Sequence, residues 1–179
     1  YPSAERSRPD GIALVGFMAA GKSTVAREVE RVSRLTAVDV DRRIEERAGE
    51  SIPEIFRARG EAGFRRLERR EIAALAGERG CVVAAGGGAV LAPGNVAALR
   101  RGRLSVWLWV DPETAGVRNA AGTRPLLTGR RSASAARRLL ESRRDAYVAA
   151  CDVLVGTEGR SPERVAALVL ECFEEVSQR

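Results

Sequence analysis

Short apolar runs alternate with longer amphipathic stretches along most of this chain of 179 residues. The apolar runs consist mainly of Val, Leu, Ala, Ile and Trp and rarely alternate with polar residues, which is typical of strands buried on both faces of a parallel sheet. This order predicts an open α/β sheet with right-handed crossovers, in which ligands bind at the carboxyl ends of the strands. The predicted strands are 12–15, 35–38, 81–85, 104–110 and 151–155, and the predicted helices are 22–34, 64–76, 96–101, 112–119, 133–149 and 162–176.

Two internal segments depart from this simple alternation. Residues 42–76 are too long for a single crossover, and we expect several short helices there, with turns at 49–51 and at Gly60. Residues 121–132 are rich in Gly, Thr and Arg, a composition that suits a mobile lid over a binding site.

The residue types that the chain lacks limit its chemistry. It contains no histidine, which excludes a Ser-His-Asp triad, a histidine general base and any zinc site with a histidine ligand. Its three cysteines, Cys81, Cys151 and Cys172, have no C-x-x-C spacing, which excludes a four-cysteine zinc site and a disulfide framework. We therefore expect buried free thiols, and any bound metal should be a hard cation with oxygen ligands.

The charge balance is basic, with 30 Lys and Arg against 24 Asp and Glu. Lys22 is the single lysine, and the other 29 cations are arginines. The acidic residues are interspersed among the arginines, so the basic charge reflects a general preference for arginine over lysine and not a basic patch. We therefore expect no nucleic-acid partner.

The chain shows no sign of membrane insertion or export. No apolar run approaches 18 residues, and residues 1–10 are polar, so we expect neither a transmembrane helix nor a secretory signal. We expect residues 1–10 to form a flexible tail. We expect residues 11–179 to form one domain with a sizeable core. We expect a cytoplasmic protein that acts as a monomer.

Residues 16–23 match the phosphate-binding loop G-x-x-x-x-G-K-[ST], called the P-loop below. An apolar strand is predicted before it and an amphipathic helix after it, as this loop requires. Backbone N–H groups and the helix N-terminus bind phosphate oxygens, while lysine reaches the β- and γ-phosphates and serine binds Mg²⁺. The residues expected to bind ATP here are Gly16, Ala19, Ala20, Gly21, Lys22, Ser23 and Thr24.

Two reservations apply to the P-loop. The simpler alternative is an ordinary strand–turn–helix with an incidental lysine, but the only lysine of the chain stands where the motif needs one. Many small kinases have glycine where this chain has Ala19. If that position requires a positive φ, the alanine carries a strain of roughly 1 kcal/mol, which we expect the loop to tolerate.

Further motifs follow the P-loop in a fixed order. Asp39 and Asp41 lie at the carboxyl end of the second predicted strand, and three glycines end the third. Two residues apart, Asp39 and Asp41 share a face if that strand continues. The full series is Val38-Asp39-Val40-Asp41, Phe64-Arg65-x-x-Glu68, Gly86-Gly87-Gly88, Arg124-Pro125-Leu126-Leu127 and Arg143-x-x-x-Tyr147.

This series resembles the shikimate kinase family, from about Gly11 to the C-terminal helix. The resemblance implies a three-layer α/β/α P-loop kinase fold with a five-stranded parallel sheet of order 2-3-1-4-5. It also implies that 42–76 holds the shikimate-binding region and that 121–132 forms the lid. The implied reaction is the ATP-dependent phosphorylation of the 3-hydroxyl of shikimate to shikimate 3-phosphate, in the biosynthesis of aromatic amino acids.

The resemblance assigns the shikimate-binding residues one by one. Asp41 resembles the carboxylate that contacts the substrate hydroxyls and helps to deprotonate the attacking one. Arg65 and Arg143 resemble the two arginines that bind the shikimate carboxylate, and an arginine fork suits that group. Backbone close to the substrate ring is implied for Gly86, Gly87 and Gly88.

The resemblance also assigns residues around the nucleotide. Asp39 resembles the acid that holds the water shell of Mg²⁺, together with Ser23 of the P-loop. Arg124 resembles the lid arginine that reaches the transferring phosphate and is therefore catalytic, like Lys22 and Asp41. Arg118 and Arg160 resemble the arginines that flank adenine. Phosphoryl transfer depends mostly on positioning and on fixed charge, so these groups suffice without histidine.

Each assignment has a simpler structural alternative. The sole role of Asp39 and Asp41 could be to cap a helix that begins at Arg42. Arg65 lies among alternating Arg and Glu residues that would ordinarily form a solvated helix face. The triple glycine could be a strand-ending turn, and we interpret Trp107 and Trp109 as packing residues.

Competing functions remain at this point. A sister kinase of aminoshikimate or another cyclitol needs few changes in the pocket. Nucleoside monophosphate or gluconate kinases share the P-loop but do not call for the other motifs. From a different class, a catalytically silent P-loop protein could serve as a binding module.

Overall fold

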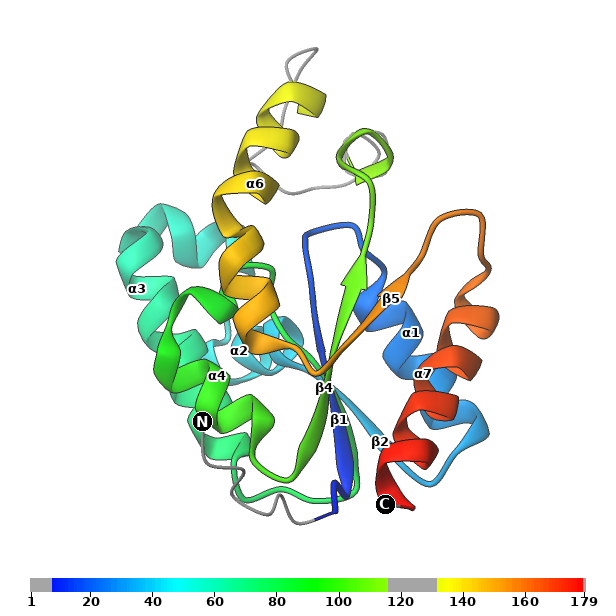
Figure 1. The fold of residues 1–179 in the computed structure, drawn as a ribbon. Coiled ribbons are helices and arrows are strands. Elements are labelled where there is room, and N and C mark those ends of the chain that lie inside the picture. Colours follow the sequence, from blue (N-terminus) through cyan, green and yellow to red (C-terminus); the bar gives the residue numbers. More distant parts are fainter. Residues whose placement is uncertain (1–7, 116–131, 179) are drawn as a thin grey trace.

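The computed structural model describes residues 8–115 and 132–178, and the statements below concern these residues. At its centre lies a five-stranded parallel sheet in the order β2-β3-β1-β4-β5, which confirms the expected order (Figure 1). The strands are β1 (Gly11–Val15), β2 (Thr36–Asp39), β3 (Cys81–Ala84), β4 (Arg103–Trp109) and β5 (Val153–Gly156).

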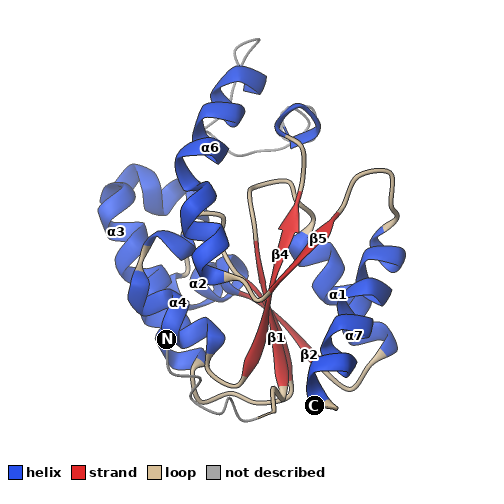
Figure 2. Cartoon of the chain, in the orientation of Figure 1, coloured by secondary structure: helices blue, strands red, loops and turns tan. Residues whose placement is uncertain are grey.

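Helices cover both faces of the sheet and complete the expected three layers (Figure 2). Helices α1 and α7 pack side by side on one face, and α3, α4 and α6 lie on the other, with α2 beside α3. The bounds are α1 (Lys22–Val32), α2 (Val40–Ala48), α3 (Ile52–Leu75), the short 3₁₀ helix η1 (Ala89–Leu91), α4 (Pro93–Arg100), α6 (Ser132–Ala150) and α7 (Pro162–Ser177). Residues 112–115 are also helical, at the start of the predicted helix 112–119.

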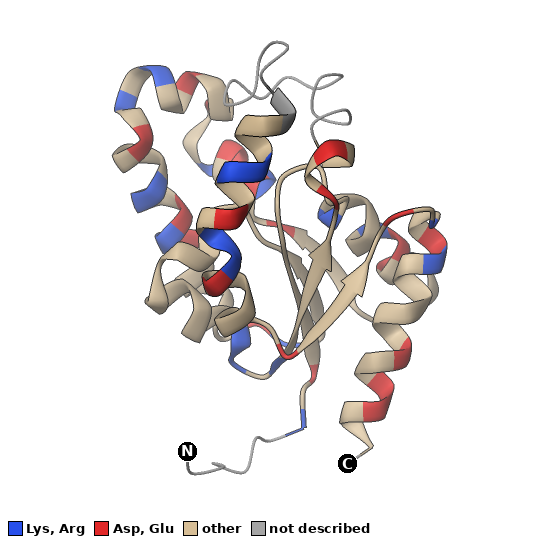
Figure 3. Ribbon diagram, turned by 45° about the horizontal axis from the view of Figure 1, so that its top comes forward, with Lys and Arg blue, Asp and Glu red and all other residues tan. Residues whose placement is uncertain are grey.

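The central strands are buried, as their unbroken apolar sequences predict. Ile12 of β1 stands in register with Val82 of β3 and Leu104 of β4, and these three side chains are at most 3% exposed. Asp39 and Arg103 are the only charged residues in the described strands. Figure 3 shows that basic and acidic residues are interspersed over the helices that surround the sheet.

Glycines divide the long segment after β2, as its sequence predicts. Gly49 ends α2 in the left-handed conformation, with φ of 67°, and its N–H donates to the Glu45 carbonyl. Ser51 and Glu54 then start α3 with a reciprocal capping box. Gly60 has φ of 63° and ψ of −179°, so it interrupts α3 without ending it. The segment therefore holds α2 and two helical halves of α3, which continue one another across the break.

The second strand does not continue far enough to place both aspartates on one face. Strand β2 ends at Asp39, one residue after the predicted end, so Asp39 and Asp41 do not share a strand face. Instead α2 begins at Val40, two residues earlier than the alternative interpretation assumed. The side chain of Asp39 accepts a hydrogen bond from the Arg42 N–H at 3.3 Å and caps this helix, while Asp41 lies in its first turn.

Several further expectations meet the structure only in part. All three cysteines are free, but only Cys81 is fully buried, and Cys151 and Cys172 are half-buried against the core. Within the described ranges, no helix has the length and apolar character needed to cross a membrane. The predicted tail lies mostly outside the described residues, as do Arg118, Arg124 and nearly all of the predicted lid.

Candidate active site

A small pocket opens at the carboxyl ends of β1, β2 and β3, the edge at which α/β proteins bind their ligands. The loop after β1, the first turn of α2, helix α3, the turn after β3 and helix α6 all contribute to its wall. Every residue that the sequence predicts to bind substrate lines this pocket. The lining residues are Met18, Asp41, Ile52, Phe56, Phe64, Arg65, Glu68, Gly86, Gly87, Gly88 and Arg143.

The P-loop forms hydrogen bonds to its own lysine. Lys22 is only 8% exposed, and its ammonium donates to the carbonyls of Gly16 and Phe17, at 2.8 Å each. Gly21 caps α1 with φ of 84°, a conformation that favours glycine. The loop therefore holds a cation at the N-terminus of a helix, where both the charge and the helix dipole favour phosphate.

Ala19 has a positive φ, which is the condition under which we expect its backbone to be strained. Its φ is 61°, and it is the only non-glycine residue with a positive φ among those described. An alanine in this region costs about 1–2 kcal/mol relative to glycine in the folded loop. Replacing it with glycine also increases the conformational entropy of the unfolded chain, which lowers the stability of the fold by about 0.4–1 kcal/mol.

These two opposing effects predict a mild phenotype for Ala19→Gly. We expect the free energy of unfolding to rise by no more than about 1.6 kcal/mol, the largest difference between the two effects. The KM for ATP should change by less than about tenfold, equivalent to 1.4 kcal/mol. Urea denaturation and ATP saturation curves measure the two effects. A fall in the ATP KM of more than tenfold would show instead that the native loop is compromised by its alanine.

Ser23 of the P-loop and Asp39 at the end of β2 offer oxygen ligands suitable for Mg²⁺. Ser23 is exposed in the first turn of α1, and Asp39 is half-buried at the end of β2. A hydroxyl and a carboxylate are the hard ligands that Mg²⁺ accepts alongside water and phosphate oxygens. In the described part of the chain, no group of three Cys, Asp or Glu residues could hold a metal by itself. The donor set therefore fits an ion that is shared with a phosphate ligand.

Arg65 is held in the pocket wall by two glutamates of α3. Its Nη1 donates to Glu68 Oε2 at 2.8 Å, and its Nη2 donates to Glu61 Oε1 at 3.3 Å. The Arg65 side chain is 21% exposed, in contrast to the solvated helix face of the simpler interpretation. Its guanidinium also lies over the Phe64 ring, with Cζ 5.3 Å from the centroid. The arginine is thus oriented before any ligand binds.

Glu68 is a site residue to which the sequence analysis gave no role. It is 1% exposed, and its Oε1 has no hydrogen-bond partner among the described residues. Burial raises the pKa of this carboxyl, and the nearby Asp41 raises it further, whereas Arg65 and Arg143 lower it. Its position three residues after Arg65, one helical turn away, is the signal that could have identified it.

The turn of three glycines after β3 lets neighbouring side chains approach the backbone closely. A Cβ on Gly88 would lie 2.4 Å from Arg65 Nη2, and a Cβ on Gly86 would lie 2.5 Å from Glu68 Oε1. Any side chain at either position would displace the Arg65–Glu68 pair. The triple glycine is therefore part of the pocket and more than a strand-ending turn.

Arg143 reaches the pocket from α6, a different helix from that of Arg65. It is 9% exposed, and its Nη1 lies 3.3 Å from the Gly87 carbonyl oxygen. Arg65 and Arg143 place two guanidinium groups on one small cavity that the carboxylate of Asp41 also lines. Such a pocket can bind an anionic group at the guanidiniums and hydroxyl groups at the carboxylate.

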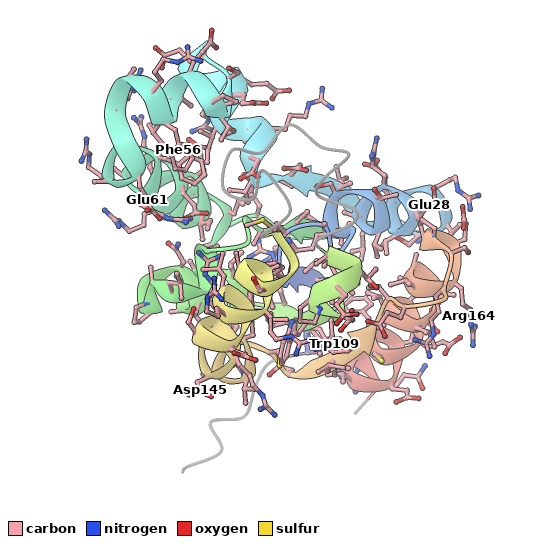
Figure 4. All side chains as sticks on the ribbon, turned by 90° about the horizontal axis from the view of Figure 1, so that it is seen from above. Glu28, Phe56, Glu61, Trp109, Asp145 and Arg164 are labelled. Carbon is pink, nitrogen blue, oxygen red and sulfur yellow. The ribbon has the colours of Figure 1, made fainter. Side chains whose placement is uncertain are left out.

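Aromatic side chains form the apolar wall of the pocket. The rings of Phe56 and Phe64 stack across the break in α3, with centroids 4.8 Å apart. Figure 4, which looks onto this edge of the sheet, shows Phe56 and Glu61 together on α3, far from Trp109. A small ligand with an apolar ring face suits this wall.

Among the residues predicted to flank adenine, Arg160 is described. It lies in the loop after β5, is exposed, and donates from Nη1 to the Gly156 carbonyl at 3.0 Å. It does not line the pocket described above. Trp107, interpreted as a packing residue, is 5% exposed and stacks on Tyr147.

Comparison with known proteins identifies chains that share these features. Residues 18–174 match the profile of the family described as Shikimate kinase. The shikimate kinase of Moorella thermoacetica is 41% identical over 167 residues, which cover 93% of this chain and 95% of that protein. The shikimate kinase of Symbiobacterium thermophilum is 41% identical over 172 residues, covering 94% of this chain and 98% of that protein.

A solved structure agrees with these sequence matches. The shikimate kinase from Acinetobacter baumannii in complex with shikimate has a TM-score of 0.90 to this chain at 30% identity. The match covers 99% of this chain and 100% of that one. The likeness therefore extends over the sheet, both helical layers and the edge that carries the pocket.

Proposed function

This chain belongs to the shikimate kinase family, and on that premise we propose how its residues transfer the γ-phosphoryl group of ATP to shikimate. It is an ATP-dependent kinase of the shikimate pathway. The observation that carries the proposed roles is the pocket beside the P-loop that Arg65, Arg143 and Asp41 line together.

Nucleotide binding falls to the P-loop. Its backbone N–H groups and the N-terminus of α1 hold the phosphates of ATP, with Ala19, Ala20 and Gly21 around them. Lys22 exchanges its two carbonyl partners for oxygens of the β- and γ-phosphates. In our proposal Arg118 and Arg160 flank adenine, and Arg124 reaches the transferring phosphate.

Mg²⁺ would be held by the hydroxyl of Ser23 directly and by Asp39 through its water shell. When bound, it would neutralise charge on the β- and γ-phosphates. Asp39 can serve both this ion and α2, because only its Oδ1 accepts the hydrogen bond from Arg42.

Shikimate would bind with its carboxylate between Arg65 and Arg143 and with its ring beside Gly86, Gly87 and Gly88. Asp41 then accepts hydrogen bonds from the ring hydroxyls. Charge-assisted bonds from two guanidiniums suit a carboxylate, and the bond to Glu68 fixes the Arg65 fork. The phenylalanine wall contacts the ring face.

In the transfer step the 3-hydroxyl oxygen of shikimate forms a bond to the γ-phosphorus of ATP. The bond from that phosphorus to the β–γ bridging oxygen breaks, and ADP leaves. The hydroxyl proton passes to the carboxylate of Asp41. Lys22 and Arg124 balance the charge on the transferring phosphoryl group, so catalysis consists mainly of positioning and electrostatic stabilisation.

The proposed reaction is tested by following ADP release from purified protein with ATP and Mg²⁺. We expect release to be rapid with shikimate and at least about a hundredfold slower without it, since ATP hydrolysis lacks a positioned acceptor. A panel that includes aminoshikimate and other cyclitols identifies the preferred acceptor. Equal rates with and without shikimate would contradict the proposal.

We also propose that the enzyme acts as a monomer in the cytoplasm. The three free cysteines suit a reducing compartment. Light scattering during size-exclusion chromatography measures the oligomeric state.

A further inference from the structure

Tyr147 of α6 is a buried polar residue that the proposed reaction does not use. It is 0% exposed, and its hydroxyl donates to the Gly87 carbonyl oxygen at 2.5 Å. Its ring stacks on Trp107 of β4, with centroids 5.3 Å apart and planes inclined by 17°. Burial raises the pKa of this phenol to about 12, so it remains a donor at neutral pH. A rigid ring thus carries one hydrogen bond into the glycine turn.

The residue that Tyr147 holds joins the two halves of the site. A Cβ on Gly87 would lie 3.2 Å from the backbone nitrogen of Met18 in the P-loop. The next residue, Gly88, lies under the guanidinium of Arg65. A shift of the Gly87 carbonyl would therefore also move the neighbouring parts of the pocket wall.

Arg143 is hydrogen-bonded to the Tyr147 hydroxyl and also contacts the same carbonyl. Its Nη1 lies 3.3 Å from the Gly87 oxygen, a longer contact than the 2.5 Å of the Tyr147 hydroxyl. The Gly87 carbonyl is partly buried, so the loss of a donor carries a free-energy cost that a remaining donor can offset. Without the phenol, Arg143 is the donor at hand. The guanidinium would then be drawn away from a ligand in the pocket.

We propose that Tyr147 is a positioning residue for shikimate, which fixes the glycine turn and leaves Arg143 available to the substrate carboxylate. This inference rests on the proposed function, because it assumes that Arg143 binds that carboxylate. Tyr147 itself is fully buried and does not line the pocket.

Tyr147→Phe tests the role, because phenylalanine keeps the ring and its stack on Trp107. We expect the KM for shikimate to rise about fivefold, the factor expected for one neutral hydrogen bond, while the KM for ATP stays within twofold. A purely structural role would alter both substrates together. Equal changes in the two KM values, or no change in either, would overturn the proposal.

A double-mutant cycle tests the route through Arg143. In an Arg143→Ala background, Tyr147→Phe should change the shikimate KM by less than about twofold, because the competing guanidinium is gone. The same fivefold factor in both backgrounds would show that Tyr147 acts independently of Arg143 and would refute the proposal.

A crystal structure of Tyr147→Phe gives a readout that needs no turnover. We expect the distance from Arg143 Nη1 to the Gly87 oxygen to shorten from 3.3 Å to about 2.9 Å. An unchanged Arg143 would refute the inference even if shikimate is phosphorylated. If wild-type protein does not phosphorylate shikimate, the proposed function fails, and this distance still decides whether Tyr147 restrains Arg143.

Discussion

Lys22→Met is expected to lower kcat for shikimate phosphorylation by a factor of about a thousand or more. Removing a single donor from a charge-stabilising site costs about 10²–10³ in rate, and the phosphate-binding cation is central to this chemistry. The chain holds no second lysine that could substitute for it. A coupled assay of ADP release at saturating substrates measures the loss.

Two controls separate this effect from misfolding. Lys22 also donates to the Gly16 and Phe17 carbonyls, so the thermal midpoint of the methionine variant must be compared with that of the wild type. Lys22→Arg keeps the charge but replaces a compact ammonium with a planar fork, and it should retain more activity than Lys22→Met. Retention of a tenth of the wild-type kcat by Lys22→Met would contradict the role assigned to the ammonium.

Arg65→Ala is expected to raise the KM for shikimate about a hundredfold and to leave the KM for ATP within about twofold. Hydrogen bonds to charged groups contribute about 1.5–3 kcal/mol each, and the upper end of that range corresponds to about a hundredfold. Arg65 lines the pocket beside Glu68 and does not belong to the P-loop. Steady-state kinetics with each substrate varied in turn separates the two constants.

The matched control is Arg66→Ala, which removes an exposed arginine from the next position of the same helix. It should leave both KM values within about twofold, because an exposed arginine outside the pocket contributes little. Arg65→Ala also leaves the buried carboxyl of Glu68 without its cationic partner, which should raise the pKa of Glu68 further. If Arg66→Ala and Arg65→Ala behave alike, the assignment of the carboxylate to Arg65 is wrong.

The sheet could be predicted from the sequence because its strands are short, apolar and separated by amphipathic helices. The expected strand order came from the family resemblance, and the structure agrees with it. The apolar run placed the end of the second strand at Val38, one residue before the observed end of β2 at Asp39. The N–H of Arg42 is satisfied by the Asp39 side chain, and this local cap outweighs continuation of the strand.

The site was predictable where a motif fixes residue types and was missed where burial decides the role. In the sequence, Glu68 cannot be distinguished from the other charged residues of a helix rich in Arg and Glu. Only the folded structure shows that it is buried against Arg65. The contact between Tyr147 and Gly87 joins residues 60 positions apart, which sequence spacing cannot reveal. Long-range contacts of this kind depend on how α6 packs over the glycine turn.

The self-contained hydrogen bonding of the P-loop has a consequence for the thermodynamics of nucleotide binding. Because Lys22 already bonds to the Gly16 and Phe17 carbonyls, the loop is ordered before ATP arrives. Binding then exchanges one set of partners for another and does not have to order a flexible segment, so the protein loses little conformational entropy in this loop. The P-loop therefore behaves as a preorganised receptor, and most of the entropy lost there belongs to the nucleotide.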